Sequence, residues 1–136
     1  MTKLRGFFLS LAVLLISLIA MAHQGDVIKA NLVMREIIQG MPKGDRQEVR
    51  VLTANFRAGD RTLFHSHRFP VTVYVVEGAF TMAMEGREPV TVKAGQAMIM
   101  PPQVKMTGYN HSNTDPLRLV AFYVSDPDTP FLDPIH

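Results

Sequence analysis

The chain has 136 residues, of which 47% are hydrophobic and 19% charged, with 14 basic and 12 acidic side chains. It contains no cysteine, which excludes disulfides, cysteine nucleophiles, iron–sulfur clusters and blue-copper sites. A chain of this length can bury one hydrophobic core but not two, so a single domain is expected.

The first 22 residues have the pattern of a secretory signal peptide. Lys3 and Arg5 precede an apolar block over residues 6–22, which ends in Ala20-Met21-Ala22. A basic start, an apolar block and a small-x-small cleavage site are typical of exported proteins. The alternative is an uncleaved N-terminal membrane anchor, because the block approaches the length of a bilayer span. Cleavage after Ala22 predicts a periplasmic mature chain without stable membrane association.

Charge argues against a nucleic-acid partner. Without Lys3 and Arg5 the mature chain has 12 basic and 12 acidic residues. No basic patch or charge run remains that would favour nucleic acid or an anionic membrane surface.

The elements that follow the leader are predicted to be strands. Residues 31–39 have apolar side chains without a clean period, which indicates a short strand or an irregular arm. Residues 48–57 alternate between two faces and predict a strand that ends at the turn 58–60. Residues 71–76 are β-branched and aromatic and stop at Glu77-Gly78, and residues 80–84 are expected to pair back across that turn.

Further short strands are expected over residues 90–92, 97–100 and 117–124. Pro127, Pro130 and Pro134 make residues 125–136 an extended arm rather than a central strand. Short strands separated by turns, with no convincing helix, indicate an all-β sandwich or barrel. The predicted organisation is a signal peptide (1–22), an N-terminal arm with a first strand (23–47), a β-barrel (48–124) and a proline-rich C-terminal arm (125–136).

The stretch from Gly59 to His67 contains the strongest functional signal. His65 and His67 lie two residues apart in a segment that is predicted to be extended, so both rings point to the same face. Two imidazoles on one face can bind one metal ion or one ligand together.

These residues resemble the first motif of the cupin superfamily of small β-barrels. In that motif a glycine precedes His-x-His by five residues, and a glutamate and a second glycine follow; Gly59, His65, His67 and Gly78 fall on this spacing. The second motif is matched by Gly95, Pro101 and Asn110, and Gln103 stands in place of its glycine. The resemblance spans roughly residues 48–124 and implies a single-domain, jelly-roll-like cupin barrel.

The resemblance implies a metal site in which the two histidines, the glutamate and a second-motif histidine bind one ion. Here Val71 occupies the glutamate position and Met106 the histidine position. Asp60 and Glu77 are too far along the chain to substitute, so the two-histidine, one-carboxylate site of iron oxygenases is not expected. His65, His67 and Met106 are the predicted metal ligands.

A thioether favours a soft ion, so ligation by Met106 would favour copper, especially Cu(I), over Mg, Mn or Fe(II). Met82, Met84, Met98 and Met100 can also face a common interior, where methionine more often serves packing. The pocket around the histidines is expected to be mostly apolar, in the manner of a small-molecule site. Its predicted contacts are Val71, Tyr74, Arg68, Tyr109 and Asn110.

Three functions are compatible with this pattern. The first is an exported small cupin that binds a metal ion or a small ligand through His65 and His67, with its catalytic role unassigned. The second is a periplasmic copper-binding protein with a His-His-Met site. The third is a metal-dependent dioxygenase or isomerase with an incomplete ligand set. The resemblance also implies a homodimer, for which strand 117–124 and the C-terminal arm would suit strand exchange.

Overall fold

The computed structural model describes residues 25–136; the predicted signal peptide and the predicted mature N-terminus, His23, lie outside this range. The chain divides into a unit that ends at Ala30 and a unit from Asn31 to His136. Residues 25–47 contain no strand, so of the two alternatives predicted for residues 31–39, a short strand or an irregular arm, the structure has the irregular arm. None of the described residues forms a helix long and apolar enough to cross a membrane.

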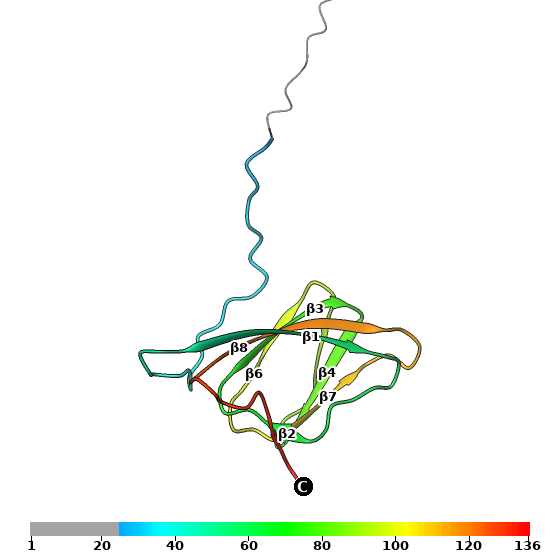
Figure 1. The fold of residues 1–136 in the computed structure, drawn as a ribbon. Helices are drawn as coiled ribbons and strands as arrows, with labels where there is room; N and C mark the ends of the chain where they lie inside the picture. The colour runs from blue at the N-terminus through cyan, green and yellow to red at the C-terminus, as the bar shows by residue number, and fades with distance from the viewer. Residues whose placement is uncertain (1–24) are drawn as a thin grey trace, which may run out of the picture. The chain divides into compact units, whose positions relative to one another are not determined.

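The described residues form an all-β fold of two antiparallel sheets (Figure 1). The first sheet has the order β1-β8-β3-β6 and the second has the order β5-β4-β7-β2-β9. The strands are β1 (Glu48–Phe56), β2 (His65–Ser66), β3 (Val71–Glu77), β4 (Ala79–Met84), β5 (Val90–Lys93), β6 (Ala97–Met100), β7 (Met106–Asn110), β8 (Leu117–Ser125) and β9 (Asp133–Pro134).

The prediction that β3 and β4 form a hairpin is wrong. β3 pairs with β6 and β8, whereas β4 pairs with β5 and β7 in the other sheet. The reason is the turn at Gly78, which has φ 83° and carries the chain from one sheet to the other. A Cβ atom at this position would clash with the carbonyl oxygen of Pro116, so only glycine fits this corner.

The suggestion that residues 117–124 form an exchangeable edge strand is also wrong. β8 is a central strand that pairs along its length with β1 and with β3. Its backbone groups are therefore already hydrogen-bonded on both sides, and it offers no free edge to a second copy.

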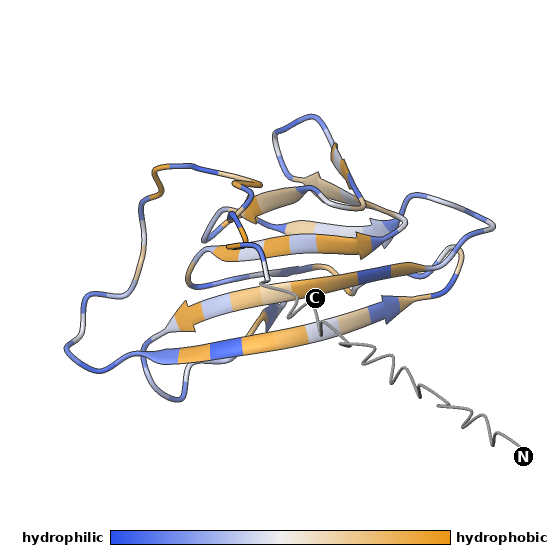
Figure 2. Cartoon of the chain, turned by 90° about the horizontal axis from the view of Figure 1, so that it is seen from above, coloured by the Kyte–Doolittle hydropathy of each residue, from blue (hydrophilic) through white to orange (hydrophobic). Residues whose placement is uncertain are grey.

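The core lies between the two sheets. Along β1 the exposed residues Val49 and Val51 alternate with the half-buried Leu52 and Ala54, as the sequence pattern predicts. Figure 2 shows hydrophilic and hydrophobic bands along the strands. Fourteen buried hydrophobic residues make up the core, and five of them are methionines: Met82, Met84, Met98, Met100 and Met106.

The C-terminal arm closes the end of the barrel near β2, where Figure 1 shows the C-terminus. β9 pairs with β2, and the amide of Ile135 donates a hydrogen bond to the carbonyl of Phe64 at 3.0 Å. Arg68 makes two hydrogen bonds to the carboxylate of Asp133, at 2.9 and 3.0 Å. These hydrogen bonds lower the pKa of Asp133. The arm therefore packs on its own barrel.

Candidate metal and ligand site

The two histidines lie inside the barrel at the end covered by the C-terminal arm. His65 is the first residue of β2, and His67 follows that strand directly. The side chains are 2% and 1% exposed, respectively. Because the segment is extended, residues two apart face the same side, and here that side is the interior.

The ring nitrogens of the pair converge on one point. His65 Nε2 and His67 Nε2 are 3.1 Å apart. The Nδ1 atoms point the other way, at 2.7 Å from the carbonyl oxygen of Leu63 and 2.6 Å from that of Phe131. A carbonyl oxygen can only accept a hydrogen bond, so each Nδ1 donates.

This arrangement fixes the chemistry of the pair. A neutral imidazole has one N–H group, so donation from Nδ1 leaves a lone pair on each Nε2. At a separation of 3.1 Å, the two Nε2 atoms can share a proton in an N–H···N hydrogen bond, or both can bind one metal ion that lies off the line joining them. A metal-binding histidine characteristically donates its other N–H to a backbone carbonyl or a carboxylate, and both rings do so here.

Burial keeps His67 neutral at physiological pH. Loss of solvent lowers its pKa to about 4, the hydrogen bond to Phe131 opposes this shift, and the charge of His65 adds to it. A neutral ring has its Nε2 lone pair available for a ligand.

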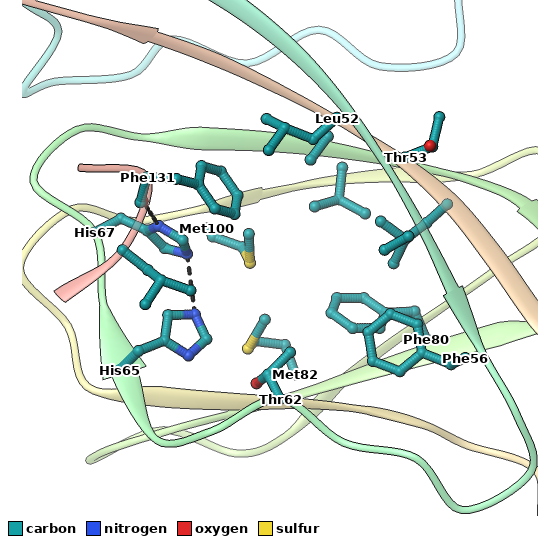
Figure 3. Close-up of a pocket in the computed structure, with 15 residues that line it drawn as sticks. Leu52, Thr53, Phe56, Thr62, His65, His67, Phe80, Met82, Met100 and Phe131 are labelled. Carbon is teal, nitrogen blue, oxygen red and sulfur yellow. Dashed lines mark hydrogen bonds between the residues drawn. The ribbon is translucent and has the colours of Figure 1, made fainter. Parts of the chain in front are cut away.

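A cavity of about 150 Å³ adjoins the pair. Its walls come from both sheets and the C-terminal arm, and they are almost entirely apolar (Figure 3). The lining residues are Leu52, Thr53, Ala54, Phe56, Thr62, His65, His67, Val73, Phe80, Met82, Met100, Leu119, Ala121, Phe131 and Leu132. An apolar cavity of this size in another protein holds a molecule as large as benzene.

The five residues predicted as pocket contacts do not line this cavity. Tyr74 and Tyr109 are half-buried residues that alternate with inward-facing neighbours on β3 and β7. Arg68 is exposed and paired with Asp133. Val71 is fully buried in the core. Asn110 is also buried, and its side-chain amide donates hydrogen bonds to two backbone carbonyls.

Met106, the third predicted metal ligand, is fully buried and lies directly opposite His65 in the pairing of β2 with β7. It does not border the cavity, whereas Met82 and Met100 do. Figure 3 shows the sulfur atoms of Met82 and Met100 on the cavity side of the histidine pair.

Carboxylates do not complete the site. Among residues 25–136 no group of three or more His, Cys, Asp or Glu side chains is placed to hold a metal ion. Glu77 is engaged by Arg118 at 2.7 Å on the surface, and Asp60 accepts a hydrogen bond from the amide of Arg57 in its turn.

Sequence reasoning missed the contribution of the C-terminal arm. Phe131 supplies the carbonyl that orients His67, and its ring lies 4.9 Å from the His67 ring, centre to centre. Leu132 lines the cavity beside it. The apolar pair Phe131-Leu132 inside a proline-rich tail was the available signal, since a free tail has no reason to be apolar.

Two packed antiparallel sheets with an inward His-x-His pair at one end define a small β-barrel with an internal cavity beside the pair. The chain matches the Cupin domain family over residues 52–123, more than half of its length, and belongs to that family. A search of curated proteins finds no match.

Solved structures agree on the fold. A cupin-like protein from Thermotoga maritima is 19% identical, with a TM-score of 0.54 over 74% of this chain and 89% of that chain. An RmlC-like cupin from Shewanella frigidimarina is 23% identical, with a TM-score of 0.51 over 60% and 69%. The DMSP lyase DddQ from Ruegeria pomeroyi is 18% identical, with a TM-score of 0.52, but this chain covers only 41% of it.

Proposed function

We propose that this protein is an exported cupin that binds a metal ion through Nε2 of His65 and Nε2 of His67. The observation that carries the proposal is the convergence of the two Nε2 atoms at 3.1 Å while both Nδ1 atoms are held by backbone carbonyls. If either ring donated from Nε2 instead, its Nδ1 would face a carbonyl oxygen without a proton, which costs about 1–3 kcal/mol for a buried group.

The spacing of the two nitrogens suits one ion. Two metal–nitrogen bonds of about 2.0 Å that end 3.1 Å apart meet at roughly 100°. A linear arrangement would need a separation of about 4 Å, so the pair occupies two adjacent positions and leaves the others open. The cavity lies beside the pair, and an apolar molecule of about the size of benzene could occupy it next to the ion.

The catalytic role stays unassigned. A dioxygenase or isomerase would need water or substrate to fill the positions that carry no protein ligand. Nothing in the geometry of the described residues favours turnover over simple binding, so binding is the function proposed.

The experiment is elemental analysis of the protein produced with its own leader and purified without chelators or a histidine tag. We expect about one equivalent of a transition metal in the parent and none in His65→Ala or His67→Ala. His111→Ala is the matched control, because His111 is exposed and its Nδ1 is hydrogen-bonded to Thr81.

Equal metal content in the parent and in both histidine variants would refute the proposal. A metal-free parent that also takes up no ion on reconstitution would do the same. In the latter case the cavity and its histidines would serve an organic ligand alone.

Export and assembly are part of the proposal. Mass spectrometry of the mature chain should show cleavage after Ala22, and fractionation should place it in the periplasm; an intact N-terminus in the membrane fraction would favour the anchor. Light scattering tests the homodimer that the family resemblance implies.

A further inference from the structure

Two of the core methionines differ from the rest in their position. Met82 on β4 and Met100 on β6 belong to different sheets, yet both border the cavity that His65 and His67 also line. Figure 3 shows both sulfur atoms pointing into this cavity. Packing alone does not require two thioethers from opposite sheets to border the same cavity as the histidines.

The strand pairing explains how each sulfur reaches the cavity. Met100 is directly opposite Val71, so it shares a face with the residue that replaces the carboxylate of the first motif. Met82 is directly opposite Gly108, which has no side chain. A Cβ atom at Gly108 would lie 2.6 and 2.7 Å from two ring atoms of Phe80 and 3.1 Å from Cε of Met82, so the glycine leaves room for both side chains.

The donor set around the cavity is soft. Besides the two imidazoles, the polar side chains that line it are the hydroxyls of Thr53 and Thr62, and the lining includes no carboxylate. The Thr62 hydroxyl already accepts a hydrogen bond from the amide of Gly108. Imidazole and thioether together suit Cu(I), whereas Mg²⁺, Ca²⁺ and Mn²⁺ require oxygen ligands.

We propose that Met82 and Met100 are thioether ligands that complete a Cu(I) site with His65 and His67. This inference rests on the proposed metal binding by the histidine pair. It assigns the sulfur ligation to the two methionines that border the cavity rather than to Met106, which pairs with His65 but does not border the cavity.

The test is an anaerobic Cu(I) competition titration with a chromophoric chelator, run beside a Zn(II) titration of the same full-length protein. Met82→Leu and Met100→Leu should each weaken Cu(I) binding by about tenfold or more. Zn(II) binding, which depends on the nitrogens, should change by less than about threefold. X-ray absorption of the Cu(I) protein should show sulfur scattering that the double variant lacks.

Met98→Leu is the matched control, because it is a buried methionine of the same core that does not border the cavity. Met106→Leu tests the competing assignment. Parental Cu(I) affinity in both Met82→Leu and Met100→Leu would overturn the thioether site, whether or not Met106→Leu weakens it. If the methionine variants keep parental Cu(I) affinity but His65→Ala loses both Cu(I) and Zn(II) binding, the thioether site fails and the proposed metal binding by the histidines stands. If His65→Ala binds both ions like the parent, both proposals fail.

Discussion

The two ends of the barrel differ in the hydrogen bonds that their buried polar side chains make. At one end Asn110 is 3% exposed, and its amide donates to the carbonyls of Arg57 and Asp115 while its oxygen accepts from the amide of Ser112. At the other end the Nε2 atoms of His65 and His67 meet only each other.

Both ends lie at positions that match cupin motifs, so the motifs alone do not separate them. The difference is one of hydrogen-bond satisfaction. A buried polar side chain whose hydrogen bonds are all made to the backbone stabilises the fold. Two neighbouring Nε2 lone pairs that no backbone group uses are instead available to bind an ion. We therefore assign a structural role to Asn110, and the same contrast supports the binding role that we propose for the histidines.

The largest effect should come from Asn110→Ala. This change removes two donors and leaves the carbonyls of Arg57 and Asp115 without their partner. The free energy of unfolding should fall by about 4 kcal/mol, with unchanged metal stoichiometry in the folded fraction. Urea denaturation measures this effect, and Asn113→Ala, an exposed change in the same loop, is the control. A loss of unfolding free energy below about 1 kcal/mol would contradict the structural role of Asn110.

Acid should act at the histidine end of the metal-free protein. The pKa of His67 is about 4 in the folded chain and 6.5 as a free side chain, so the unfolded state binds more protons between these values. Stability should be constant above pH 6.5, fall by up to about 3 kcal/mol as the pH drops to 4, and then level off for this group.

The comparison for this titration is His67→Gln, which should abolish the slope between pH 6.5 and 4. Asp133 contributes only at lower pH, because Arg68 lowers a pKa that is already acidic. An unchanged slope in His67→Gln would assign the acid sensitivity to other groups.

Metal should raise the unfolding free energy of the chain by binding at the histidine end, and no binding is expected at the Asn110 end. At a free metal concentration about 100 times the dissociation constant, the gain in unfolding free energy is about 2.7 kcal/mol. Thermal melts with and without the ion should show this gain in the parent and in Asn113→Ala, but not in His65→Ala. A gain that persists in His65→Ala would place the ion elsewhere.

The smallest effect concerns the backbone beside the histidines. Gln103 stands where the second motif has glycine and adopts φ 61°, while its amide donates to the carbonyl of His67 at 2.8 Å. Gln103→Gly should stabilise the chain by about 1 kcal/mol by relieving left-handed strain. Asp128→Gly at φ 62° should gain less, since aspartate tolerates this region better. Equal gains in unfolding free energy for the two variants in urea denaturation would contradict the explanation by left-handed strain at Gln103.

Much of the fold could be predicted from the sequence. Alternation and β-branched runs locate β1, β3, β4, β6 and β8 to within two residues at each end. β7 was missed because Met106-Thr107-Gly108-Tyr109-Asn110 contains a glycine and polar residues. The turn at Gly78 was recognised, but its change of sheet depends on the contact with Pro116, which is far along the chain.

The site was only partly predictable, for a related reason. A spacing of two residues is enough to place His65 and His67 on one face. The partners that orient the rings and the cavity that adjoins them come from β4, β6 and the C-terminal arm, which are distant in sequence. Pairing between distant segments is set by tertiary packing, which no local pattern encodes.

The most direct test of the account is ¹⁵N NMR of the imidazole rings before and after addition of one equivalent of a diamagnetic ion, Zn(II) or Cu(I). The account predicts that His65 and His67 both carry their proton on Nδ1 in the metal-bound state and that both Nε2 resonances shift together with the metal. A proton that stays on either Nε2, with no shift on titration, would contradict it.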